Sequence, residues 1–254
     1  MKGGSMDIKK LLNYNEHQNK IYIHNEIFEE LKVLGNHAAF AYTYYYLICW
    51  LYRYAKYGEI QIDVKLIKEL LGYNPTNKKL DYLIKKGGLL DEIGLTETST
   101  DYPLVWTFVD GDLEFTMLSD FDDEVRKMYL KQKGKNYKVK VPVKALSRNG
   151  ENGTFYDIGY THEVEFDLFV KCMESDLGCS GYYIYGYLKY RCDKFGEYNS
   201  SLERLGEELG MSKNTVDKYL TILCQDGLIE CKVNDCRLVD GEFVKKSNTY
   251  KLKG

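Results

Sequence analysis

The stretch SLERLGEELGMSKNTVDKYLTILCQDGLIE, residues 201–230, decides the fold of this chain. Its first half has leucines at helical spacing, which predict a short helix with one buried face that Gly210 ends. Ser212 suits the N-cap of a second helix, because its hydroxyl can accept a hydrogen bond from a free amide of the first turn. The buried residues of the two helices would be Leu202, Leu205 and Leu209, then Val216, Leu220 and Leu223. The stretch therefore predicts two helices joined by a three-residue turn.

A second group of segments follows the turn at Asp226 and Gly227. Apolar residues there are separated by polar, glycine-containing turns, which predicts β-strands joined in a hairpin. These residues are Leu228, Ile229, Val233, Leu238, Phe243, Val244 and Tyr250. Two helices followed by a hairpin form a winged helix, in which the second helix enters the DNA major groove.

The pattern L-x-x-L-G-x-x-L-G-M-S-x-x-T-V-x-x-Y-L-x-x-L-x-x-x-G-L-I runs over residues 202–229. It resembles the winged helix-turn-helix of bacterial DNA-binding proteins, and the resemblance covers residues 181–250. The resemblance implies contact with double-stranded DNA through the second helix. Two alternatives stay open: winged helices also serve as dimerisation or protein-interaction modules, and the polar face of the second helix can simply be solvated.

An internal repeat becomes visible when residues 42–72 are aligned with residues 180–210. Ten of the 31 aligned positions are identical. They are Tyr44-Tyr45 with Tyr182-Tyr183, Tyr52-Arg53 with Tyr190-Arg191, Lys56 with Lys194, Gly58-Glu59 with Gly196-Glu197, Glu69 with Glu207, and Leu71-Gly72 with Leu209-Gly210. The chain therefore contains two copies of one unit.

The repeat extends upstream, where residues 20–23 resemble residues 163–166 and Leu34-Gly35 parallels Leu177-Gly178. Each unit is thus expected to begin with a strand and a short helix before a long tyrosine-rich helix. The long helices, expected over residues 38–56 and 181–194, carry apolar residues on more than one face. We expect them to pack between the units or between protomers.

The first copy also continues like the second beyond the aligned residues. Asn74 is expected to cap its second helix, Pro75 suits the first helical position, and Gly87-Gly88 would end the helix. A hairpin wing is expected from strands at residues 105–109 and 113–118. The buried face of the helix would be Leu80, Leu83 and Ile84.

These patterns predict an α+β fold, mainly helical, with two tandem winged-helix domains at residues 7–120 and 161–254. Residues 64–90 should then form two helices across a tight turn. Residues 1–6, MKGGSM, are interpreted as an expression leader with Met6 as the natural start.

Charge is distributed unevenly along the chain. The 35 basic and 38 acidic residues give a net charge of −3, so DNA binding has to depend on local patches. Residues 110–124 carry seven acids and no base, whereas residues 126–148 carry nine bases and no acid. The basic run lies in residues 121–160, expected to be a basic linker with a strand near residues 137–141. Its candidate phosphate contacts are Lys131, Lys133, Lys135 and Lys138, and a solvated linker is the alternative.

Candidate DNA contacts lie on the exposed sides of the second helices. In the second copy they are Ser212, Lys213, Asn214, Thr215, Lys218 and Thr221. Asparagine can bind adenine, lysine guanine or phosphate, and threonine the thymine methyl group. The first copy is more basic, which favours backbone contact, and its candidates are Asn77, Lys78, Lys79, Tyr82, Lys85 and Lys86. Wing candidates, with ordinary surface charge as the alternative, are Lys232, Arg237, Lys245 and Lys246.

Several other classes of protein are disfavoured by the sequence. Seven cysteines without C-x-x-C spacing indicate reduced thiols and a cytoplasmic location, and the spacing of Cys224, Cys231 and Cys236 fits no familiar zinc finger. No phosphate-binding loop, metalloprotease motif or serine-hydrolase motif occurs, and the four histidines are scattered. We therefore expect no enzyme, no catalytic residue, no metal, no cofactor and no small-molecule substrate. The apolar stretch at residues 38–52 is too short to span a membrane.

The sequence thus favours a sequence-specific protein that binds double-stranded DNA, and it leaves open whether the protein forms a homodimer. The layout of two winged helices in one chain resembles plasmid and phage replication initiator proteins, in which tandem winged domains bind origin repeats. A transcriptional regulator is the first alternative, and a winged-helix protein-interaction scaffold is the second.

Overall fold

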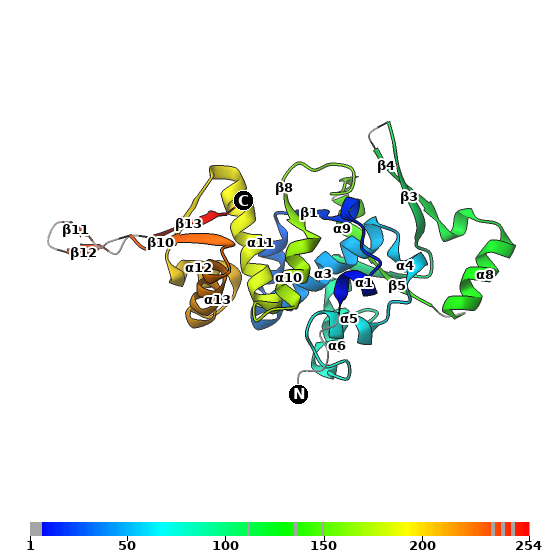
Figure 1. The fold of residues 1–254 in the computed structure, drawn as a ribbon, viewed down its shortest axis with the longest axis horizontal. Coiled ribbons are helices and arrows are strands. Elements are labelled where there is room, and N and C mark those ends of the chain that lie inside the picture. Colours follow the sequence, from blue (N-terminus) through cyan, green and yellow to red (C-terminus); the bar gives the residue numbers. More distant parts are fainter. Residues whose placement is uncertain are drawn as a thin grey trace.

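The computed structural model describes residues 7–110, 112–134, 137–148, 150–234, 237–239, 242–244 and 247–253. The fold is α+β, with helices and small antiparallel sheets of two or three strands (Figure 1). The chain begins with α1 (Ile8–Leu11) and a 3₁₀ helix, η1 (Glu16–Gln18). Strand β1 (Lys20–His24), α2 (Ile27–Lys32) and η2 (Gly35–His37) follow.

The centre of the molecule is α3 (Ala38–Arg53), in which all residues are buried. A helix that is apolar on every side needs neighbours on every side. It packs against α11 (Gly178–Phe195), α2, α4 (Lys56–Glu59), β1 and strand β5 (Val139–Pro142). The predicted long packing helices are therefore confirmed, and they pack between the two units. No helix within the described ranges is long and apolar enough to cross a membrane.

The two units are also joined by a strand pair. Strand β1 of the first unit pairs antiparallel with β8 (Thr161–Glu165) of the second, and Ile21 lies opposite Val164 in the middle of the register. The upstream repeat aligns these same two residues, each 143 positions from the other. An approximate twofold axis that passes between two antiparallel strands places equivalent residues opposite each other, as Ile21 and Val164 are here.

The second unit has the predicted order of elements apart from one additional strand, β9 (Tyr198–Ser200), which the sequence did not indicate. After β8 and α10 (Phe166–Met173) come α11 and β9. Helices α12 (Leu202–Leu209) and α13 (Lys213–Gln225) are separated by residues 210–212, as expected. Strand β13 (Asn248–Leu252) then pairs with both β9 and β10 (Ile229–Lys232). The expected hairpin tip is β11 (Arg237–Val239) with β12 (Glu242–Val244).

The first unit departs from the prediction of two helices across a tight turn, which is wrong here. Helix α5 (Val64–Leu70) is followed by the longer connection of residues 71–77, then by η3 (Lys78–Leu80) and α6 (Asp81–Ile84). The side chain of Asn74 accepts a hydrogen bond from the amide of Thr76, which forms a local turn in place of a helix cap. The cap is Asn77, whose side chain accepts from the amide of Lys79. The buried face of Leu80, Leu83 and Ile84 is confirmed.

A large insertion lies between the sheet strands of the first unit. After α7 (Leu89–Glu92), strand β2 (Thr96–Ser99) pairs with β5, so the expected strand near residues 137–141 is present and extends this unit at least to Pro142. Between them, β3 (Pro103–Val109) and β4 (Asp112–Met117) form the predicted hairpin. The insertion also contains η4 (Leu118–Asp120) and α8 (Asp123–Lys133). After β5 come α9 (Val143–Leu146), β6 (Ser147–Arg148) and β7 (Glu151–Asn152).

A buried hydrogen-bond network fastens the joint between the units. His162 of β8 donates from Nδ1 to Oδ1 of Asn25 (3.0 Å) and accepts at Nε2 from the hydroxyl of Tyr42 on α3 (2.8 Å). The same hydroxyl would lie only 2.3 Å from a Cβ atom at position 186 of α11, so glycine there permits the close approach of the two helices. Burial, together with the interactions with nearby His24 and Lys189, lowers the pKa of His162 to about 3.

We predict that His162 makes the free energy of unfolding decrease as the pH falls below 7. In the unfolded chain it binds a proton below about pH 6.5, but in the folded protein only below about pH 3, so the unfolded state binds more protons in this window. Between pH 7 and pH 5 its contribution to the free energy of unfolding should fall by about 2 kcal/mol. Urea unfolding at both pH values measures the loss, which should be absent from His162→Gln. The exposed His17→Gln is the control, and an equal pH dependence in all three proteins would contradict the prediction.

Candidate nucleic-acid interface

Helix α13 has a well-defined start. The hydroxyl of Ser212 accepts a hydrogen bond from the amide of Thr215 (3.2 Å), which confirms the predicted N-cap. Gly210 has φ +65° and ends α12 in the left-handed region, where residues other than glycine are strained. The predicted buried face of α13 is also confirmed, because Val216, Leu220 and Leu223 are all buried. The opposite face of the helix is thereby held toward solvent.

The exposed face of α13 carries the predicted contact residues. Lys213, Asn214, Lys218 and Thr221 are exposed, as is the capping Ser212, whereas Thr215 is half-buried. The ammonium of Lys213 forms an ion pair with Glu203 of α12. The hydroxyl of Thr221 donates to the backbone oxygen of Asp217 (2.9 Å). The side-chain amide of Asn214 has no hydrogen-bond partner in the described part of the chain. Asn214 and Lys218 are therefore the side chains best placed to reach a ligand.

The corresponding face of the first unit is shorter and more basic. Its candidates Lys78, Lys79, Tyr82, Lys85 and Lys86 are exposed, and Asn77 caps the segment. The acidic Asp81 pairs with Lys68, whose side chain is buried and also donates to the backbone oxygen of Asn77. Because the buried Lys68 offsets the charge of Asp81, that carboxylate does not cancel the charge of the exposed lysines. The four lysines at positions 78, 79, 85 and 86 therefore form a positive surface.

The wing candidates are only partly covered by the structure. Lys232 is exposed on β10, opposite Thr249 of β13. Arg237 lies in β11, of which only the backbone is described, and Lys245 and Lys246 lie outside the described residues. The hairpin of β11 and β12 extends away from the body of the protein at the left of Figure 1. The described strands β11 and β12 therefore lie beyond α12 and α13, away from the rest of the protein (Figure 1).

The basic run belongs to the first unit rather than to a free linker. Four of its bases form ion pairs: Arg126 with Asp123, Lys140 with Asp91, Lys144 with Glu30 and Arg148 with Glu26. Lys133 is half-buried, and desolvation lowers its pKa. Lys131 and Lys138 are exposed, whereas Lys135 lies outside the described residues. Of the candidate phosphate contacts, Lys131 and Lys138 are thus the most available.

A groove of about 430 Å³ lies between the start of α12, the C-terminal half of α13 and strand β10. Glu203 and Asp217 line it, together with Cys224 and Cys231. Carboxylates oppose the approach of phosphate, so this groove is a poor site for a nucleic-acid backbone. Contact with DNA is better served by the N-terminal half of α13.

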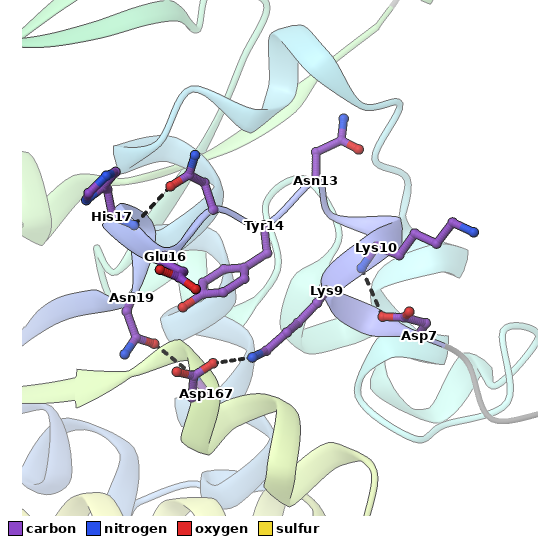
Figure 2. Close-up of a pocket in the computed structure, with 10 residues that line it drawn as sticks. Asp7, Lys9, Lys10, Asn13, Tyr14, Glu16, His17, Asn19 and Asp167 are labelled. Carbon is purple, nitrogen blue, oxygen red and sulfur yellow. Dashed lines mark hydrogen bonds and ion pairs between the residues drawn. The ribbon is translucent and has the colours of Figure 1, made fainter.

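A second depression, of about 1050 Å³, lies over the N-terminal segment (Figure 2). Asp167 at the start of α10 binds the ammonium of Lys9 (2.5 Å) and donates its backbone amide to Asn19 (2.9 Å). Asp7 caps α1 by accepting from the amide of Lys10 (3.0 Å). Lys9 and Asn19 therefore fasten the N-terminal segment to Asp167 of the second unit. The sequence did not indicate this groove, because the N-terminal segment meets Asp167, a residue far away along the chain, only in the folded protein.

The described cysteines carry free thiols, and Cys49, Cys172, Cys179 and Cys192 are buried. Among the described residues, no group of three or more histidine, cysteine or acidic side chains is arranged to hold a metal ion. Cys236 of the rejected zinc set lies outside them.

Comparison with known proteins identifies no relative. No protein-family model matches the chain, no curated protein matches its sequence, and no solved structure matches its fold.

Proposed function

We propose that this chain is a sequence-specific protein that binds double-stranded DNA. It is built from two winged helices and acts without catalysis. The proposal is supported above all by the way in which α13 is presented to solvent. Its N-terminus is capped by Ser212, its inner face is anchored by core residues, and Asn214 and Lys218 project from its first two turns. A helix presented in this way can enter the major groove and bring N-terminal side chains to base edges.

The first unit complements α13 with charge. Its segment η3 and α6 is about half the length of α13, with 3 and 4 residues against 13. So short a segment, with Lys78, Lys79, Lys85 and Lys86 around it, suits contact with phosphates more than with bases. In Figure 1 both segments lie on the lower side of the molecule, a placement that supports binding to one duplex.

Among roles for such a protein, we propose replication initiation at a plasmid or phage origin. The support is the layout, in which two similar units in one chain are fixed by β1 with β8 and by α3 with α11. Tandem units held in this way suit repeated sites in DNA. Sequencing of DNA fragments recovered with the protein tests the role: enrichment of origin repeats is expected, and enrichment of promoters would show a transcriptional regulator.

We predict that Asn214→Ala weakens binding to the preferred duplex by about 1–3 kcal/mol and relaxes specificity at one base pair, because a bidentate contact to adenine is lost. Competition between preferred and random duplexes measures both effects. Gln225→Ala, an exposed substitution at the other end of α13, is the matched control and should change neither. Equal losses on preferred and random duplexes would exclude base recognition by Asn214.

We also predict that the exposed lysines of the basic run contact phosphates. Replacing Lys127, Lys131 and Lys138 by Gln should weaken binding to all duplexes alike and flatten the plot of log affinity against log salt by up to about three units. The control is the double substitution Lys144→Gln and Arg148→Gln, which removes bases that already pair with Glu30 and Glu26. A salt slope unchanged in the triple variant would mean that these lysines are merely solvated.

A further inference from the structure

Arg53, the last residue of α3, is an unusual buried charge. Arg53 is only 9% exposed, and its guanidinium forms no ion pair with the described residues. Its Nε atom is buried without a hydrogen-bond partner among them. The guanidinium carbon lies 5.6 Å from the ring centre of Phe155, 5.8 Å from that of Tyr54 and 6.0 Å from that of Tyr22.

These rings offset only part of the cost of burying the charge. Cation–π contacts contribute about 0.5–2 kcal/mol, whereas an unpaired buried ion costs several kcal/mol. Tyr54 lies close to the guanidinium but is neutral. On the adjacent strand, the carboxylate of Glu163 is bound by Lys20 at 3.0 Å. Among the described residues, no carboxylate forms an ion pair with the guanidinium, although Glu16 lies in the lining of the same pocket.

The repeat provides an internal comparison. Arg191 aligns with Arg53, and its Nη1 donates to the hydroxyl of Tyr187 (3.4 Å), which donates in turn to the carboxylate of Glu208 (2.9 Å). The Nε atom of Arg191 is also buried without a hydrogen-bond partner among the described residues, but its Nη1 is thus linked to a carboxylate of its own unit. The position that aligns with Glu208 in the first unit is Leu70, which is buried in the core. The first unit has kept the arginine and has an apolar residue in place of the acid.

Arg53 lines a pocket of about 370 Å³, a size within the range of small-ligand sites. Trp106 and Phe108 of β3 form one wall, and Phe108 is 58% exposed. Tyr54 packs edge-on against Trp106, with ring centres 5.2 Å apart. The rest of the lining is Tyr22, Lys20, Glu16, His17 and Asn19. Glu16, His17 and Asn19 also line the groove of Figure 2, so the pocket adjoins that polar groove.

From this arrangement we infer that the Arg53 pocket binds a nucleotide. The phosphate pairs with the guanidinium of Arg53, and the base stacks on Trp106 or Phe108. Arginine matches phosphate geometry, and aromatic rings stack on bases of any sequence. A free mononucleotide and a nucleotide of an unpaired DNA strand share this chemistry. The inference goes beyond duplex binding, because no residue of the pocket belongs to α13, η3 or α6.

Tryptophan fluorescence of the full chain tests the site. Trp106 lines the pocket, whereas Trp50 is buried, with its Nε1 donating to the backbone oxygen of Gln18 (2.7 Å), so a ligand in the pocket should quench Trp106. The probes are thymidine monophosphate, thymidine, inorganic phosphate, single-stranded oligothymidylate and a blunt duplex. We expect quenching by thymidine monophosphate, by the oligomer or by both, and weaker binding of thymidine and of phosphate, each of which lacks half of the ligand.

Variants assign the effect to the pocket. Arg53→Gln should weaken nucleotide binding about 10- to 100-fold, and Phe108→Ala about 5- to 100-fold if the base stacks there. Phe108 is exposed, so its variant keeps the test valid if Arg53→Gln fails to fold. The matched controls are Arg191→Gln, the aligned arginine, and Phe195→Ala, an exposed aromatic of α11 that is 66% exposed. Both should bind like the wild type.

The outcomes separate this inference from the duplex proposal. Tighter binding of the oligomer than of the mononucleotide identifies an unpaired strand as the ligand, and the reverse identifies a free nucleotide. The inference is overturned if no nucleotide probe binds at millimolar concentration, if phosphate alone binds as tightly as thymidine monophosphate, or if Arg53→Gln and Arg191→Gln lose affinity equally. Asn214→Ala should leave nucleotide binding unchanged, so failure of duplex recognition and failure of this site are distinguishable.

Discussion

Complete burial of α3 is the constraint on which the rest of the structure depends. A helix without a solvent-facing side has to be covered on every side, and α11 of the second unit provides a large part of that cover. Gly186 allows the two helices to approach closely at Tyr42, and the strand pair of β1 and β8 closes the same joint. The two units are therefore packed as one body, and the positions of α13 and of η3 with α6 relative to each other follow from this packing.

The same repeat has produced two chemically different units. The second keeps a long α13 with varied polar side chains, while the first has a short, lysine-rich segment. The difference extends to the arginine shared by the long helices, which reaches a carboxylate through Tyr187 in the second unit and lies in an aromatic pocket in the first. The insertion between β2 and β5 supplies the Trp106 wall of that pocket. The shorter helical segment, the insertion and the changed partners of the shared arginine thus account for the proposed division of roles.

Local signals made α12 and α13 predictable from the sequence. Helical spacing of leucines, Ser212 as a cap and Gly210 as a terminator all act within one or two turns. The first unit was harder, because Asn74 and Asn77 both suit a cap. The structure shows that Asn74 forms a local turn with Thr76 and that Asn77 caps the helical segment.

Long-range contacts could not be predicted in the same way. The pairing of β1 with β8 joins strands far apart in the chain, and the basic run looked like a linker because its partners Glu26, Glu30 and Asp91 precede it by many residues. Burial of Arg53 depends likewise on Phe155, on the rings of β3 and on the strand pair. An alignment within the chain indicated that Arg53 is repeated, but only the fold shows that it forms no ion pair with the described residues.

Hydroxyl-radical footprinting on a duplex selected from a random-sequence pool tests the central claim most directly, since it shows whether both units contact one DNA molecule. If the rigid pair of units presents α13 and the lysines around α6 to the same duplex, two protected patches should appear on one face, about one helical turn apart. A single patch on the selected duplex, or no sequence enriched from the pool, would contradict the account.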